Sequence, residues 1–176
     1  MGQGLDLGAG IGPGVGQGFM TPFGTNVALD ASIPGRFYDF KQISRGKPVE
    51  DYQIGGKDFD DRVRAIQKAG YRESAFRKFS QAPETLYLTQ IAVPYSPANS
   101  GPEFFNVADK VKPAGWFVHY QGEVTVNRDI TFRFIGTGDD YIGVFAKGRP
   151  RMISSWGLSP RSGEAIFSGT MCQFSM

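Results

Sequence analysis

The segment from Trp116 to Val126 alternates residue by residue between two sets of side chains. The mainly apolar set consists of Trp116, Val118, Tyr120, Gly122, Val124 and Val126. The other set is more polar and includes His119, Gln121 and Glu123. Because successive side chains of a strand point to opposite faces of a sheet, this pattern predicts a strand with one buried face and one wetter face.

Further short strands with turn signals between them are indicated along the rest of the chain. They are expected at residues 37–42, 85–93, 130–135, 141–146, 151–156 and 165–174. Aromatic side chains fall on both faces of the first of these, and Lys147-Gly148 forms a hairpin turn. Strands at this spacing predict a mainly β protein, an antiparallel β-sandwich.

One or two short helices are expected on one side of this sandwich. Phe59, Val63 and Ile66 follow one another at i, i+4 and i+7, which is the spacing of one helix face, and Gly70 stands where a helix ends. A second short helix is predicted from Ser74, with the Ser74 hydroxyl as its N-terminal cap. Both helices are expected to cover one sheet.

Residues 1–35 are predicted to be a Gly-rich flexible tether, because glycine loses the most backbone entropy on folding. Residues 36–176 are predicted to be one domain, which is either complete or truncated at its C-terminus. The repeated glycines do not form a dinucleotide-binding loop, because no strand precedes them and no acidic residue follows at the required distance.

Composition excludes several classes of function. The net charge of +2, with no polybasic run, argues against nucleic acid as a partner. The single cysteine, Cys172, excludes an internal disulfide and a zinc site built on cysteines. No stretch has the roughly 20 apolar residues of a membrane span, and the N-terminus lacks the pattern of an export signal.

The residues also argue against an enzyme. His119 is the only histidine and stands in the strand pattern without a nucleophile beside it, so a cross-strand contact is expected for it. The serines around Trp156 do not form a G-x-S-x-G nucleophile turn. Trp116 shares the apolar side of its strand and is expected in the core, whereas Trp156 is a candidate for stacking on a sugar ring.

The run from Trp116 to Gly148 resembles the central block of PA14-like domains. The matching residues are Trp116, Gly122, Phe132, Phe134, Gly138, Asp139, Asp140, Val144 and Gly148. The resemblance implies a β-sandwich of the kind attached to bacterial toxins, glycosidases and adhesins, and hence an extracellular or cell-envelope location. It implies a binding or adhesion module in which Asp139 and Asp140 hold calcium, with Gly138 and Trp156 beside a carbohydrate. Glycans or other envelope components are then the expected partners.

Two alternatives stay open at this point. Adjacent carboxylates in a glycine-flanked loop suit calcium, but calcium needs six to eight oxygen ligands. No Asp or Asn follows Asp140, and Glu164 is the one later carboxylate. Asp139 and Asp140 are therefore either metal ligands or the residues of a turn, held by side-chain bonds to backbone amides. The domain is correspondingly either a binding module or a structural spacer of a larger envelope protein without a small ligand.

Overall fold

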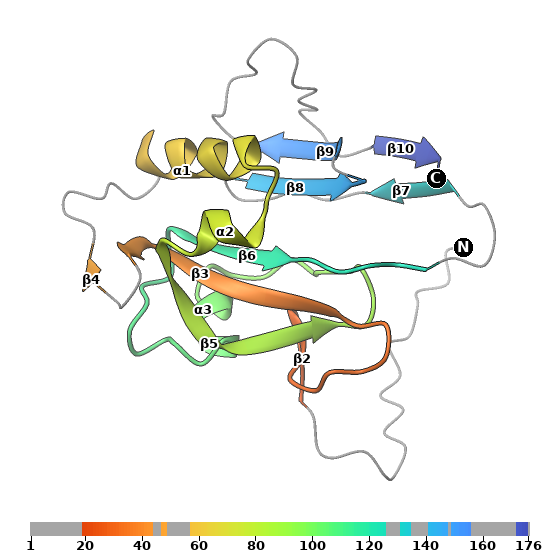
Figure 1. The fold of residues 1–176 in the computed structure, drawn as a ribbon. Helices are drawn as coiled ribbons and strands as arrows, with labels where there is room; N and C mark the ends of the chain where they lie inside the picture. The colour runs from red at the N-terminus through yellow and green to blue at the C-terminus, as the bar shows by residue number, and fades with distance from the viewer. Residues whose placement is uncertain are drawn as a thin grey trace, which may run out of the picture.

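A six-stranded antiparallel sheet forms the centre of the protein. The computed structural model describes residues 19–43, 47–48, 57–125, 131–134, 141–147, 149–155 and 172–175. The strands are, in sheet order, β1 (Met20–Thr21), β2 (Gly24–Thr25), β5 (Phe79–Leu88), β3 (Ile33–Ile43) and β4 (Lys47–Pro48), and β6 (Trp116–Tyr120) also pairs with β3. The long strand β3 thus has β5 along one edge and β6 along the other (Figure 1).

Two antiparallel pairs of strands accompany the large sheet. β7 (Thr131–Phe134) pairs with β10 (Cys172–Ser175), and β8 (Tyr141–Ala146) pairs with β9 (Arg149–Ser155). Side chains of β8, from Tyr141 and Phe145, pack against the core of the large sheet. This second layer of strands confirms the prediction of a mainly β, antiparallel, sandwich-like fold.

The short helices lie on both sides of the large sheet. They are α1 (Lys57–Lys68), α2 (Glu73–Phe76) and α3 (Ser100–Phe104). In α1 the predicted apolar positions are buried, and Gly70 has a positive φ of 64° just after the helix, as expected of a helix end. The predicted cap of α2 is wrong, because Arg72 precedes this helix and Ser74 lies inside it. Helix α3 was not among the helices predicted from the sequence, and its first three residues are buried.

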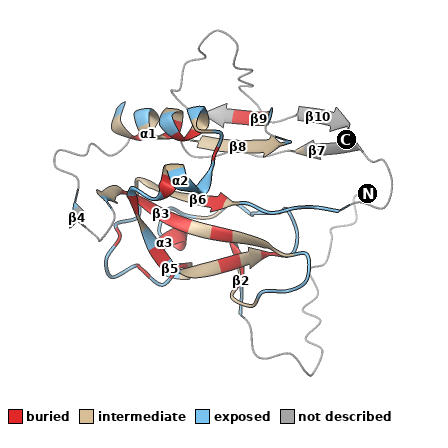
Figure 2. Ribbon diagram, in the orientation of Figure 1, coloured by how far each residue is buried: buried red, intermediate tan, exposed pale blue. Residues whose placement is uncertain are grey.

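Aromatic side chains leave β3 on both faces and build two separate cores. Figure 2 marks the buried residues of β3 and of the helices. We name the two cores after the helix on each side. The α1-side core consists of Tyr38, Phe40, Phe59, Val63, Ile66, Tyr71, Phe76 and Phe79. The α3-side core consists of Phe23, Phe37, Ala82, Leu86, Phe105, Val107 and Val111. The prediction of aromatics on both faces of this strand is confirmed. The reason is that each face of β3 packs against its own cluster of buried residues.

Three predicted boundaries differ from the structure. The folded region begins before residue 35, because β1, β2 and the buried Phe23 precede this point and β3 already runs through it. The strand predicted over 85–93 starts earlier, at Phe79, and ends at Leu88. The strand predicted over 116–126 ends at Tyr120, and Val124 is half exposed. Residues 1–18 of the predicted tether lie outside the described part.

In the part of the chain that the structure describes, no helix has both the length and the apolar character needed to cross a membrane.

Candidate ligand-binding cleft

The binding residues predicted from the sequence cannot be placed. Gly138, Asp139, Asp140 and Trp156 all lie outside the described residues. Within the described ranges, no group of three or more metal-ligating side chains comes together. The calcium site therefore stays a prediction, and the site described below is a different one.

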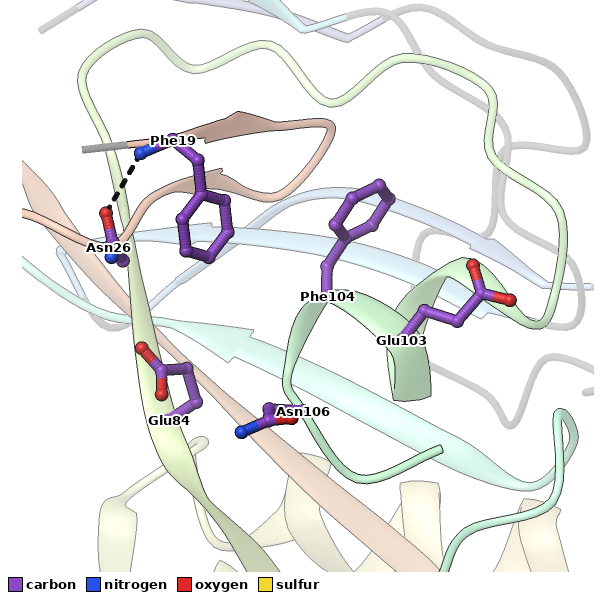
Figure 3. A pocket seen from close by; sticks show the side chains of 6 residues that line it. All are labelled: Phe19, Asn26, Glu84, Glu103, Phe104 and Asn106. Carbon is purple, nitrogen blue, oxygen red and sulfur yellow. Dashed lines mark hydrogen bonds between the residues drawn. The ribbon is translucent and has the colours of Figure 1, made fainter. Parts of the chain in front are cut away.

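A cleft of about 330 Å³ opens on the α3 side of the large sheet. It is lined by Phe19, Asn26, Glu84, Glu103, Phe104 and Asn106. Figure 3 shows the rings of Phe19 and Phe104 on one side of the space, with the side chains of Glu84 and Asn106 on the other. The N-terminal hairpin, β5 and the end of α3 each contribute to this wall, so segments more than 80 residues apart meet here.

Gly24 fixes the N-terminal side of the cleft. Its φ is 112°, and a Cβ atom at this position would lie 2.4 Å from the carbonyl oxygen of Tyr87. Only glycine allows the β1–β2 hairpin to approach β5 this closely. The buried ring of Phe23 then packs 5.8 Å from that of Phe105, centroid to centroid, and the amide nitrogen of Phe19 donates to Asn26 Oδ1 at 3.2 Å. The hairpin thereby holds Phe19 and Asn26 at the cleft.

The C-terminal end of α3 fixes the opposite side. The amide of Asn106 donates to the carbonyl of Glu103 at 3.1 Å, and that of Val107 donates to the carbonyl of Pro102 at 2.9 Å. Asn106 itself has a φ of 55°. These are the two hydrogen bonds and the left-handed residue of a Schellman helix end, in which asparagine is tolerated. The motif places the Asn106 side chain in the cleft wall.

Trp116 anchors α3 to the sheet. Its indole Nε1 donates to the carbonyl of Ala98 at 2.9 Å, and its ring stacks on Phe37 with centroids 5.5 Å apart. A Cβ atom on Gly101 would lie 2.8 Å from the Trp116 ring, so the helix approaches the ring closely because this residue is glycine. The predicted core position of Trp116 is confirmed.

The cleft combines flat apolar faces with hydrogen-bonding groups. The Phe19 side chain is half exposed, at 48%. The Glu84 carboxylate makes no hydrogen bond or ion pair with any described residue, whereas Glu103 accepts a hydrogen bond from Asn99 at 2.7 Å. A ring face, a carboxylate and an amide can together hold a ligand that has both a C–H surface and hydroxyl groups.

His119 takes no part in this cleft. It lies on the opposite face of β6 and is buried against Phe76, not on a wetter face as the alternation of the strand predicted. His119 does lie opposite a residue of the neighbouring strand, as predicted, because Arg36 of β3 is its partner in the register of the sheet. Burial, with a smaller contribution from the positive charge of Arg36, lowers the pKa of His119 from 6.5 to about 4.

Sequence reasoning missed the cleft because its residues form no local motif. Phe19 and Asn26 fall in the predicted tether, and no helix was predicted over residues 100–104, which lead into Asn106. One usable signal was present. Asn at position 106, just after a short apolar run, is a residue that helix ends accept.

Comparisons with protein-family models, with curated proteins and with solved structures found no match to this chain. Its function is therefore inferred from its own residues.

Proposed function

We propose that the domain is a non-catalytic carbohydrate-binding module and that the cleft between the N-terminal hairpin, β5 and α3 is its binding site. The single observation that carries the proposal is the meeting of the Phe19 and Phe104 rings with the Glu84 carboxylate, which has no partner in the described part of the chain. An apolar ring face packs against the C–H face of a pyranose, and a carboxylate accepts hydrogen bonds from two neighbouring hydroxyls.

Binding is favoured over catalysis by the position of the protein's one histidine. His119 is buried in the aromatic layer on the other side of the sheet, so it is not available to a ligand in the cleft. The cleft therefore has no histidine for general acid–base chemistry, and its two carboxylates, Glu84 and Glu103, are proposed as acceptors for the hydroxyl groups of a sugar.

A calcium ion held by Asp139 and Asp140 belongs to the same proposal as a second feature. So does an extracellular or cell-envelope location, which is where a module that binds glycans of a surface would act. Neither depends on the cleft, and each is open to a separate test.

The test of the cleft is glycan binding by the full chain and by two aromatic variants. Phe19→Ala removes one platform of the cleft. Tyr95→Ala removes an aromatic ring that is 98% exposed and does not line the cleft, so it is the matched control. Titration calorimetry with cellohexaose, mannohexaose and chitohexaose should give saturable binding to at least one of them. Affinity should fall about tenfold in Phe19→Ala, which corresponds to about 1.4 kcal/mol, and should not change in Tyr95→Ala.

Binding that is equal in both variants would place the sugar elsewhere, and no binding to any neutral glycan would remove the function itself.

A structural or assembly role is the second candidate, and a different observation favours it. Ile91, Val93 and Tyr95 expose large apolar surfaces in the segment after β5, at 56%, 49% and 98%. Neighbouring exposed apolar side chains of this size mark contact surfaces between proteins. If this segment mediates assembly, the full chain should oligomerise in light scattering, and Ile91→Ser/Tyr95→Ser should be monomeric while retaining glycan binding.

A further inference from the structure

A second cavity of about 250 Å³ lies next to the cleft. Its polar lining comes from Asp39 and Gln42 of β3, Ser80 and Gln81 of β5, and Asn106 and Lys110. Asn106 thus lines both cavities. Each cavity by itself is near or below the lower end of the usual range for a ligand pocket, which is about 300–1,000 Å³.

The same two segments wall both cavities. On one side, Ser80 and Ala82 of β5 border the second cavity and Glu84 borders the cleft. Gln81 and Pro83 border the second cavity as well, so residues 80–84 form one continuous stretch of lining across the register irregularity in the pairing of β5 with β3. On the other side, the cleft is bordered by Glu103, Phe104 and Asn106, and the second cavity by Asn106, Val107, Lys110 and Val111. The two cavities therefore follow one another along a groove, with Asn106 at their junction.

The second cavity also contains a hydrogen-bond acceptor without a partner. The Asp39 side chain is only 2% exposed, and its Oδ2 atom has no hydrogen-bond partner in the described part of the chain. The other oxygen, Oδ1, accepts from the backbone nitrogen of Lys41 at 3.0 Å and from its Nζ at 2.6 Å. Because Oδ2 has almost no exposed surface, a ligand donor reaches it only when the side chains around it shift, and such a donor would relieve an acceptor that is costly to leave unpaired.

Resting on the proposed function, we infer that this groove binds a neutral oligosaccharide of at least two sugar units, one in the cleft and the next in the cavity bordered by Asp39. The cleft supplies ring faces and the Glu84 carboxylate. The second cavity supplies hydroxyl and amide groups, and its buried charge is balanced because Lys41 pairs with Asp39. A polyanionic glycan is disfavoured, because it would bring its charge against Glu84.

An extended peptide fits the groove less well than a sugar chain. A peptide that adds to the edge of a sheet needs a continuous ladder of backbone N–H groups. Along the groove, β5 contains Pro83, which has no N–H to donate. A row of side-chain carboxylate, hydroxyl and amide groups suits the hydroxyls of a sugar chain instead.

The test is how affinity depends on ligand length in the full chain and in three variants. The probes are the mono- to tetrasaccharides of whichever neutral series binds in the calorimetric experiment above. Affinity should rise at least tenfold from one unit to two. Asn106→Gly keeps the left-handed backbone and removes the shared amide, so it should weaken binding of the disaccharide. Ser80→Leu narrows the second cavity. It should remove the gain in affinity that the second sugar unit brings, without changing the affinity for the monosaccharide.

Lys110→Ala is the third variant, and it tests the second cavity independently in case Ser80→Leu does not fold. The Lys110 side chain is 76% exposed, so its removal should not disturb folding, and it too should reduce the gain from the second unit. The inference is overturned if affinity does not depend on length while Phe19→Ala still weakens binding, an outcome that leaves the proposed function standing. Hexalysine is a basic peptide that would suit the acidic side chains of the groove. If it binds the full chain, loses affinity in Phe19→Ala, and no neutral glycan binds, both this inference and the proposed function are overturned.

Discussion

The imidazole of His119 lies nearly parallel to the ring of Phe76, with centroids 4.5 Å apart and 16° between the planes. Its Nδ1 atom is buried and has no hydrogen-bond partner among the described residues. Arg36 lies on the neighbouring strand in register with it, and Glu73 at the start of α2 has a smaller, opposing effect. The site thus accommodates a neutral imidazole and disfavours a charged one.

Stability should therefore fall in mildly acidic solution. The pKa of His119 is about 4 in the folded protein and 6.5 in the unfolded chain, so between these values the unfolded chain binds more protons. The contribution of the neutral His119 to the free energy of unfolding is present above pH 6.5 and is lost as the pH falls towards 4. The free energy of unfolding should therefore be about 2 kcal/mol lower at pH 5 than at pH 7. Urea unfolding at both pH values measures this. His119→Phe keeps an aromatic ring against Phe76 but has no titrating group, so it should lose about 2 kcal/mol less than the parent between pH 7 and pH 5. An equal loss of stability in both proteins would contradict the role of His119.

The buried ion pair of Asp39 and Lys41 holds the wall of the second cavity. Lys41 Nζ also donates to the carbonyls of Lys112 and Ala114, which ties residues 112–114 to β3. Asp39→Ala should cost about 3–5 kcal/mol in urea unfolding, because it removes the counter-charge of the mostly buried Lys41 ammonium group and leaves it only carbonyl partners. The double variant Asp39→Leu/Lys41→Met should recover much of this loss, and two simply additive effects would show that the pair is not coupled.

Gly24→Ala should detach the N-terminal hairpin from β5. The new Cβ atom would clash with the carbonyl group of Tyr87, and the φ of 112° at residue 24 is unfavourable for alanine. We expect a loss of at least about 1 kcal/mol, with faster hydrogen exchange confined to residues 19–27. Gly70→Ala is the matched control, because Gly70 also has a positive φ but nothing lies within 4 Å of its Cβ position. Its cost should come from backbone strain alone and leave exchange in the hairpin unchanged.

Calcium binding by Asp139 and Asp140 is tested by calorimetry on the full chain. We expect saturable heat on adding calcium, and none in Asp139→Asn/Asp140→Asn, because the neutral amides lose the charge that attracts a hard cation. Glu84→Gln should bind calcium like the parent and lose affinity for glycan. If neither the parent nor the double variant gives heat, the two aspartates are turn residues and glycan binding at the cleft proceeds without metal.

Part of the fold could be predicted because it depends on local pattern. The apolar spacing of Phe59, Val63 and Ile66 placed α1, and the limits of β8 follow directly from the run between residues 141 and 146. The aromatic residues of β3 were also correctly predicted to lie on both faces of the strand. In each case neighbouring residues of one segment carry the whole signal.

The candidate site could not be predicted in the same way. His119 belongs to the more polar set of its alternating segment, but α2 and Tyr71 cover its face of β6 and bury it. Phe19 and Asn26 stand next to a glycine-rich stretch, but contacts of Phe23 with Phe105 hold them at the sheet. Burial and proximity are set by distant segments, which a local pattern does not contain.

The sequence by itself determined the class of fold, the position of α1 and the strands of alternating apolar and polar residues. Those features follow from backbone geometry, which repeats every two residues in a strand and every 3.6 in a helix. Only the tertiary structure decided that both faces of the large sheet are covered and that Phe19, Glu84 and Asn106 share one groove. The physical reason is that a groove exists only where separate elements pack side by side, and this packing depends on the close approaches that Gly24 and Gly101 permit.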